Sequence, residues 1–234
     1  MVAIAVVEVL MAAVADDQVA ARVVMVAGAT GLVGREVLAA LLADDSYKAV
    51  HTLGRTPPGV QDPKLTAHVV DLARLPKLPR IDDAYIALGT TVKVAGSRAA
   101  FRAIDLDAVV AVAKAARAAG ATRLGVVTAM GADATSAVFY NRVKGEAEDA
   151  LQALGFPCLV IARPSMLSGD RAALGQPGRL GEHFALPLMA LFKPAIPANY
   201  RSVSASDVAG ALVNAVMSTE KGCRILNSSS MQSV

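Results

Sequence analysis

The stretch RVVMVAGATGLVGREVLAALLAD, residues 22–44, decides the fold class because it joins a strand, a glycine-rich turn and a helix. Residues 22–28 form a β-branched apolar run that predicts a buried strand. From residue 31 onward apolar positions recur with a helical period, and the side chains that we expect to face inward are Leu32, Val33, Val37, Leu38 and Leu41. A strand that passes through a glycine turn directly into a helix is typical of a parallel βαβ unit.

The three glycines of this turn have the spacing Gly-x-x-Gly-x-x-Gly. We expect Gly28 to permit a tight turn, Gly31 to let the backbone approach a pyrophosphate, and Gly34 to let the helix pack close to the sheet. The helix N-terminus adds free N–H donors and the positive end of its dipole. The predicted phosphate-binding loop is therefore Gly28, Ala29, Thr30, Gly31, Leu32, Val33 and Gly34. A glycine-rich turn without a ligand is the alternative.

The rest of the chain alternates short β-branched runs with longer helices rich in Ala and Leu. Further strands are predicted over residues 47–55, 67–72, 84–91, 123–131 and 157–164, and further helices over 97–121, 137–154 and 204–218. Ser206 or Asp207 is expected to cap the last helix. The pattern predicts an α/β fold, a doubly wound parallel sheet of the Rossmann type with a small C-terminal substrate-side lobe.

The chain divides into three predicted segments: an N-terminal extension at 1–21, the nucleotide-binding domain at 22–164, and a small substrate lobe at 165–234 that completes the same domain. The extension is apolar but carries Glu8 and lacks a basic segment, so neither a signal peptide nor a membrane span is predicted. We therefore expect a cytoplasmic protein that does not bind membranes.

Composition argues against several classes of function. The residues are 54% hydrophobic and only 4% aromatic, which suits buried parallel strands. The net charge of +3 is spread without runs of Lys or Arg, so no nucleic-acid partner is predicted. Cys158 and Cys223 lack the spacing of metal ligands and the three histidines are scattered, so neither a metal site nor a disulfide framework is predicted.

The end of the second strand bears on the choice of dinucleotide. An acid there would bind the ribose 2′-hydroxyl of NAD, but this chain has Arg55, which can pair with a 2′-phosphate, with Arg35 as a possible helper. NADP(H) is therefore favoured over NAD(H), and a solvated surface arginine is the alternative. Since ligands bind at the carboxyl ends of parallel strands, the adenine is expected beside Asp71 and Leu72, and the ribose and phosphates beside Leu88, Gly89, Thr90 and Thr91.

The stretch FYNRVKGEAE, residues 139–148, places Tyr140 and Lys144 on one face of a predicted helix. A phenol titrates near pH ~10, too high to exchange protons readily at neutrality, and an ammonium one turn away favours the phenolate. The pair suits acid–base chemistry, but two such residues also occur at this spacing by chance. Other motifs have to decide between the two interpretations.

Four separated motifs together resemble a known family: the glycine spacing, LGTT followed by AGS and AF, GAD followed by FYNRVKGEAE, and RPSMLSG. They resemble the atypical short-chain dehydrogenase/reductases (SDRs), in particular the NADPH-binding oxidoreductases similar to the human Tat-interactive protein and its bacterial relatives. The resemblance covers about residues 22–227. It implies the SDR variant of the Rossmann fold.

The resemblance also implies roles for individual residues. Tyr140 would exchange a proton with a carbonyl oxygen, and Lys144 would hold the nicotinamide ribose hydroxyls. Where the family usually has Ser after the fifth strand this chain has Thr128, and Ser136 is the competing hydroxyl. The backbone expected to contact the nicotinamide carboxamide is that of Pro164, Ser165 and Met166, and the side chains expected near the substrate cavity are Arg179 and His183.

Two classes of function follow from these motifs. The first is an NADPH-dependent oxidoreductase that acts on a small carbonyl compound, for which the pair of Tyr140 and Lys144 is the motivation. A nucleotide-sugar epimerase or dehydratase is the other enzyme considered, although its large C-terminal lobe would not fit the residues that remain. The second class is a binding protein that senses NADP(H) and signals to a partner. A homodimer is possible in either class.

Overall fold

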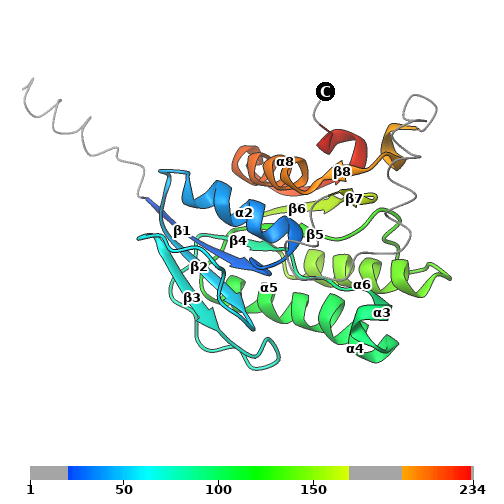
Figure 1. Ribbon diagram of the computed structural model, residues 1–234, viewed down its shortest axis with the longest axis horizontal. Coiled ribbons are helices and arrows are strands. Elements are labelled where there is room, and N and C mark those ends of the chain that lie inside the picture. The colour runs from blue at the N-terminus through cyan, green and yellow to red at the C-terminus, as the bar shows by residue number, and fades with distance from the viewer. Residues whose placement is uncertain (1–20, 169–196, 233–234) are drawn as a thin grey trace, which may run out of the picture.

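The computed structural model describes residues 21–168 and 197–232 of the 234-residue chain. Its centre is a sheet of seven parallel strands in the order β3-β2-β1-β4-β5-β6-β9 (Figure 1). The order reverses beside β1, and ligands of open α/β sheets bind outside the carboxyl ends of the strands at such a point. The strands are β1 (Arg22–Ala27), β2 (Tyr47–Gly54), β3 (Leu65–Val69), β4 (Asp83–Ile86), β5 (Arg123–Val127), β6 (Cys158–Arg163) and β9 (Gly222–Asn227).

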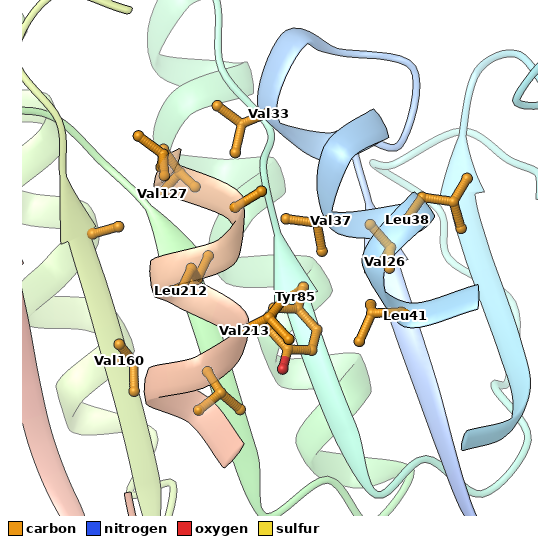
Figure 2. Packing of buried hydrophobic residues seen from close by; sticks show 14 of the residues in the cluster. Val26, Val33, Val37, Leu38, Leu41, Tyr85, Val127, Val160, Leu212 and Val213 are labelled. Carbon is orange, nitrogen blue, oxygen red and sulfur yellow. The ribbon is translucent and has the colours of Figure 1, made fainter. Parts of the chain in front are cut away.

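Helices cover both faces of this sheet (Figure 1). On one face, α2 (Leu32–Leu42) and α8 (Ala205–Ser218) pack side by side, and their apolar side chains form one core cluster with the strands. Figure 2 shows Val37 of α2, Leu212 of α8 and Tyr85 of β4 within that cluster. On the other face, α5 (Val109–Ala118) and α6 (Phe139–Ala153) contribute to a second cluster with the strands. Each fully buried Val or Leu side chain stabilises the layers by about 1.5–3 kcal/mol.

The long helix predicted over residues 97–121 consists of three segments. They are α4 (Arg98–Arg102), a π-helical segment (Ala103–Ala108) and α5, and a short helix α3 (Val92–Ala95) precedes them. Wide π turns inside helices are frequent at functional sites. Asp105 lies in the π-helical segment and is almost fully buried.

The predicted fold class is confirmed: the sheet is parallel and doubly wound, and every predicted strand forms. The strand ends differ from the predicted ones. β3 ends at Val69, before Asp71, and β4 ends at Ile86. The residues LGTT therefore lie outside the sheet, in the loop that follows β4.

The residues after 196 complete the main layers through α8 and β9. Strand β9 was not predicted, because GCRILN follows a helix directly and most of its side chains are exposed. A second sheet pairs β7 (Leu167–Ser168) with β8 (Val203–Ser204). Residues 169–196 lie outside the described residues, and the role of 165–234 as a substrate lobe stays a prediction.

The N-cap of α8 corrects one prediction. The hydroxyl of Ser204 accepts a hydrogen bond from the Asp207 backbone N–H at 3.0 Å, so Ser204 caps the helix. The prediction of Ser206 or Asp207 is wrong because the helix begins earlier, at Ala205. The spacing of Ser204 and Asp207 is the one that lets an N-cap oxygen reach the N3 amide.

A buried polar cluster lies at the amino ends of β1, β2 and β4, and we refer to Arg22, Tyr47 and Asp83 as the amino-edge cluster. Arg22 forms an ion pair with Asp83, and the Tyr47 hydroxyl donates to the second Asp83 oxygen at 2.7 Å. Burial raises the pKa of the Asp83 carboxyl, while Tyr47 and Arg22 act in the opposite direction. Both carboxylate oxygens therefore have partners in a site closed to water.

Two further properties hold for the described parts of the chain. None of their helices has the length and apolar character needed to cross a membrane. They also contain no group of three or more His, Cys, Asp or Glu side chains placed to hold a metal ion. His51 of β2 and His68 of β3 do meet, with Nδ1 and Nε2 3.0 Å apart.

Candidate cofactor and active site

The glycine loop between β1 and α2 has a geometry that other residues could not adopt. Gly28 has φ of +86°, and a Cβ there would lie 2.6 Å from the Ala87 carbonyl oxygen. A Cβ on Gly34 would lie only 2.0 Å from the Gly28 carbonyl oxygen, so this glycine lets α2 start against the turn. Gly31 is less crowded, with its nearest neighbour at 3.3 Å. The roles predicted for Gly28 and Gly34 agree with this packing.

The start of α2 leaves backbone donors for a ligand. Its N-cap is Gly31, which has no side chain to satisfy the first amides of the helix. Leu32 and Val33 direct their side chains into the core, so only their backbone N–H groups can serve an anion, and Ala29 and Thr30 form the turn before them. Uncapped amides at a glycine turn fit a pyrophosphate.

The residues at the ends of β2 and β3 occupy the same edge of the sheet. Arg55 directly follows β2 and is exposed. Arg35 of α2 pairs with its neighbour Glu36 at 3.2 Å, with both side chains about one-third exposed. After β3, the Asp71 carboxylate accepts the Ala73 N–H at 2.9 Å, and Leu72 packs against the second core cluster. Of the two arginines predicted to bind the 2′-phosphate, Arg35 forms an ion pair with Glu36, whereas Arg55 forms none within the described residues.

The LGTT loop after β4 lies against a buried ion pair that we refer to as the carboxyl-edge pair, Lys144 of α6 and Asp105 of the π-helical segment. Lys144 Nζ and Asp105 Oδ1 are 2.8 Å apart, and their side chains are 5% and 0% exposed. The other carboxylate oxygen, Oδ2, accepts the Thr90 N–H at 3.0 Å. Leu88 and Gly89 precede this contact, and Thr91 caps α3 through a bond to the Val94 N–H.

Tyr140 lies one turn before Lys144 on α6, as predicted. Its ring packs on the fully buried Phe101, with ring centroids 5.4 Å apart. Within the described residues the Tyr140 hydroxyl makes no hydrogen bond, and the residue is partly exposed. The ring is therefore held in place while its hydroxyl stays available to another molecule.

The two hydroxyls considered as partners of Tyr140 have different surroundings. Thr128 is buried and donates to the Glu148 carboxylate at 2.6 Å, and Glu148 is also paired with Arg163. Glu148 lies eight residues beyond Tyr140, or about 12 Å along the helix, so the Thr128 hydroxyl is engaged away from the phenol. Ser136 lies just before α6, where its Oγ accepts the Val138 N–H at 3.2 Å. A catalytic role for either hydroxyl stays a prediction.

Glycine 145 fixes α6 at this edge. A Cβ there would lie 2.1 Å from the Ala134 backbone nitrogen and 2.2 Å from the Asp133 carbonyl carbon. The glycine that follows Lys144 in the sequence therefore lets the helix contact the loop after β5 directly. Any larger residue would move the face that carries Tyr140 and Lys144.

The segment after β6 borders a small pocket. The Pro164 carbonyl accepts the Met130 N–H at 2.9 Å, the Met166 carbonyl accepts the Val203 N–H, and Ser165 bonds to Ser228 Oγ at 2.8 Å. The pocket has a volume of about 170 Å³, and its lining residues are Met130, Gly131, Arg163, Asn199, Tyr200, Asn227 and Ser228. All of them follow or end strands at the carboxyl edge or belong to the 3₁₀ helix Ala198–Tyr200.

Two of the predicted site residues, Arg179 and His183, lie outside the described residues.

One buried residue at this edge of the sheet was missed by the sequence analysis. Asp105 was not predicted, although a signal was present: Phe101, Asp105 and Val109 are four residues apart, so an acid falls on the apolar stripe of the helix. A charged residue in such a stripe is seldom fully buried unless it has a partner.

Comparison with known proteins identifies the family and the fold. Residues 28–219 match the model of a family described as NAD(P)H-binding. In solved structures the chain resembles MoeE5 in complex with UDP-glucose and NAD (TM-score 0.65, 17% identity, 87% of this chain and 75% of that one). It also resembles a short-chain dehydrogenase family protein from Francisella tularensis (TM-score 0.66, 11% identity, 90% and 99%). At these identities the structures support the fold alone.

Curated relatives overturn the expected location. Protein FMP52-1, mitochondrial, of Scheffersomyces stipitis is 36% identical over 154 residues, which are 62% of this chain and 67% of that protein. Protein fmp52, mitochondrial, of Emericella nidulans is 37% identical over 154 residues, 62% and 66%. The chain thus spans about two thirds of the length of these relatives. Because they are named as mitochondrial, the prediction of a cytoplasmic protein is contradicted. The family match over most of the chain, which includes the glycine loop and the helix that carries Tyr140 and Lys144, shows that this protein belongs to the family described as NAD(P)H-binding.

Proposed function

We propose that the protein is an NADPH-dependent oxidoreductase that reduces a small carbonyl compound, or oxidises the corresponding alcohol. One observation carries the proposal. Tyr140 and Lys144 share a face of α6, and Lys144 is buried against the loop that follows β4, at the edge of the sheet where the glycine loop also opens. A phenol with a free hydroxyl is therefore beside the expected cofactor.

Each residue has a defined task in this proposal. The uncapped amides of α2 bind the pyrophosphate, and Arg55 pairs with the 2′-phosphate that distinguishes NADPH from NADH. Lys144 holds the nicotinamide ribose hydroxyls, and Tyr140 gives a proton to the substrate oxygen. The bound cofactor supplies the hydride, so that hydride and proton together convert a carbonyl into an alcohol.

The pocket at the ends of β5, β6 and β9 supports a place for the substrate. Tyr200 and Met130 give it partly exposed apolar walls, while Asn199 and Asn227 contribute amides. The nearby Arg163 is neutralised by Glu148, since two of its nitrogens bond that carboxylate. A small, uncharged carbonyl compound suits these walls better than a dianionic one.

The proposal is tested with Tyr140→Phe, which keeps the ring packing on Phe101 and removes the hydroxyl. We expect the oxidation of NADPH in the presence of a panel of aldehydes and ketones to be lost, while NADPH binding measured by fluorescence is retained. Unchanged turnover in this variant would exclude Tyr140 as the acid. A wild-type protein that binds NADPH but turns over no compound in the panel would favour the sensing function.

A further inference from the structure

We propose that His51 and His68 form a binding site for a divalent first-row transition metal ion, with one imidazole nitrogen from each as ligands and water in the remaining positions. The site lies at the β2–β3 edge of the sheet and does not depend on the proposed function. The sequence predicts no metal site because its three histidines are scattered along the chain. The pairing of β2 with β3 brings two of them together.

The backbone holds both histidines on one face of the sheet. In the parallel register His68 lies opposite Leu53, and His51 lies two residues before Leu53 on the same strand. Because side chains two residues apart on a strand point to the same face, both rings share the face of Leu53, which belongs to the second core cluster. Helix α2 packs on the other face. The pair is therefore separated by the sheet from the helix that follows the glycine loop.

The spacing of the two rings suits a shared metal ion. His51 Nδ1 and His68 Nε2 are 3.0 Å apart, and the ring centroids are 5.2 Å apart with an interplanar angle of 38°. Two nitrogens that each lie about 2.0–2.1 Å from one ion are roughly 2.9–3.4 Å apart when the angle at the metal is between square-planar and tetrahedral. An ion can therefore replace the hydrogen bond if the rings turn, without a shift of the strands.

The chemistry of the pair favours a transition metal. Imidazole nitrogens suit Zn²⁺, Ni²⁺ and Cu²⁺, whereas Mg²⁺ prefers oxygen ligands. A ring has to be neutral to bind a metal, and burial, helped by His68, lowers the pKa of His51 and so favours its neutral form.

Metal binding requires one proton to move within the pair. In the hydrogen bond one of the two inner nitrogens carries a proton, which has to pass through solvent to the outer nitrogen of the same ring. The outer nitrogens, His51 Nε2 and His68 Nδ1, make no hydrogen bond within the described residues and can accept it. Both inner lone pairs then face the ion, and two neutral rings bind it without net release of a proton.

The pair is accessible from solution. Both histidines are half-buried, and the strand residue opposite His51, Thr66, is exposed. Two protein ligands do not complete a coordination sphere, so the ion keeps water and exchanges with the solvent. An ion bound across the two strands would also tie the edge strand β3 to β2. We therefore expect the stability of the protein to respond to the concentration of free metal.

The experiment measures Ni²⁺ binding to the tag-free protein by calorimetry, in wild type, His51→Asn and His68→Asn. Thr66→Val is the matched control, because the residue lies beside the pair and supplies no nitrogen. Each histidine variant should bind Ni²⁺ at this site at least about tenfold more weakly, since even groups that only orient a metal ligand contribute that much. The control should match wild type. Cu²⁺ should bind wild type more tightly than Ni²⁺ does, and Mg²⁺ should give no difference among the four proteins.

Urea unfolding gives a second readout. Ni²⁺ at about 100 times its Kd should raise the unfolding midpoint of wild type and of Thr66→Val, and neither histidine variant should show this increase. The metal-dependent change is compared, so a lower intrinsic stability of a variant does not affect the result. Equal Ni²⁺ affinity in wild type and both histidine variants would overturn the proposal, and so would a wild-type protein that binds no Ni²⁺. Loss in only one of the two histidine variants would show a site that uses a single ring, which also contradicts a shared ion.

Discussion

The two ends of the sheet each contain a buried ion pair with an aspartate, but the pairs differ in what they connect. In the amino-edge cluster, Asp83 binds Arg22 and Tyr47, and all three residues lie on neighbouring strands. In the carboxyl-edge pair, Asp105 binds Lys144 and the Thr90 N–H, which belong to a helix and a loop. The first pair joins strands that the sheet already holds together, whereas the second joins a helix side chain to the loop that follows β4.

The nearby tyrosines show the same difference. The Tyr47 hydroxyl is fully buried and bonded to Asp83, and burial is the main cause that raises its pKa far above the ordinary value. Tyr140 is partly exposed, and its hydroxyl is unbonded in the described residues. The same residue type therefore serves stability at one edge and remains available for chemistry at the other.

The largest expected effect separates these tyrosines. Tyr140→Phe should reduce the turnover of a carbonyl substrate by about 10²–10⁴-fold, the usual contribution of a general acid, with stability little changed. Tyr47→Phe should leave turnover unchanged and lower the free energy of unfolding by about 1–3 kcal/mol, because a buried Asp83 oxygen loses its donor. Steady-state kinetics and urea unfolding of both variants provide the comparison. If Tyr47→Phe lost turnover while Tyr140→Phe kept it, the assignment of catalysis to Tyr140 and of stability to Tyr47 would be wrong.

The next effect concerns the amino-edge pair itself. Asp83→Ala removes one partner of a buried pair and leaves the Arg22 guanidinium uncompensated, so we expect a loss of about 3–5 kcal/mol in the free energy of unfolding. The folded fraction should still bind NADPH with wild-type affinity, because the cluster lies at the opposite edge from the glycine loop. Denaturant titrations with and without NADPH measure both quantities. A variant that is fully stable, or that is folded but no longer binds, would contradict this role.

A smaller effect tests the dinucleotide preference. Arg55→Ala should weaken NADPH binding by about tenfold and leave NADH binding unchanged, because only NADPH carries the 2′-phosphate. Arg224→Ala, an exposed arginine on β9, is the matched control and should change neither. Fluorescence titrations of each variant with both dinucleotides give the four affinities. Equal losses for NADPH and NADH would show that Arg55 does not read the phosphate.

The smallest effect is a pH dependence of stability at the amino edge. Burial raises the pKa of Asp83, so its contribution to stability is fully present below the ordinary pKa of an aspartate and is lost as the pH rises through the raised value. Asp83→Asn removes this titration. We expect the stability of wild type relative to Asp83→Asn to increase as the pH falls through that window, measured by urea unfolding at several pH values. A constant difference would mean that the Asp83 pKa is unshifted.

The parts of the site that could be predicted from the sequence depend on local spacing. The glycine loop is a local pattern in the sequence, and Gly34 lies against Gly28 within the turn itself, although the backbone that crowds Gly28 is that of Ala87 after β4. The shared face of Tyr140 and Lys144 also follows from helical geometry alone. A parallel sheet with helices on both faces was likewise expected, because strands and helices alternate along the chain.

The parts that could not be predicted depend on contacts between distant segments. Asp105 and Lys144 are far apart in the sequence, and the π-helical segment interrupts a pattern that looks like one continuous helix. Thr128 was considered for its position after a strand, but its partner Glu148 is supplied by α6. Strand β9 lies at the sheet edge with most of its side chains exposed, and its sequence GCRILN has no alternation of polar and apolar residues that would have predicted a strand.

The measurement that tests the central claim most directly is a titration of the purified wild-type protein with NADPH and with NADH, followed by fluorescence. The account predicts saturable NADPH binding that 2′,5′-ADP displaces, and weaker binding of NADH. Absence of binding by both dinucleotides would contradict the assignment of the carboxyl edge as a cofactor site, together with the roles proposed for Tyr140 and Lys144.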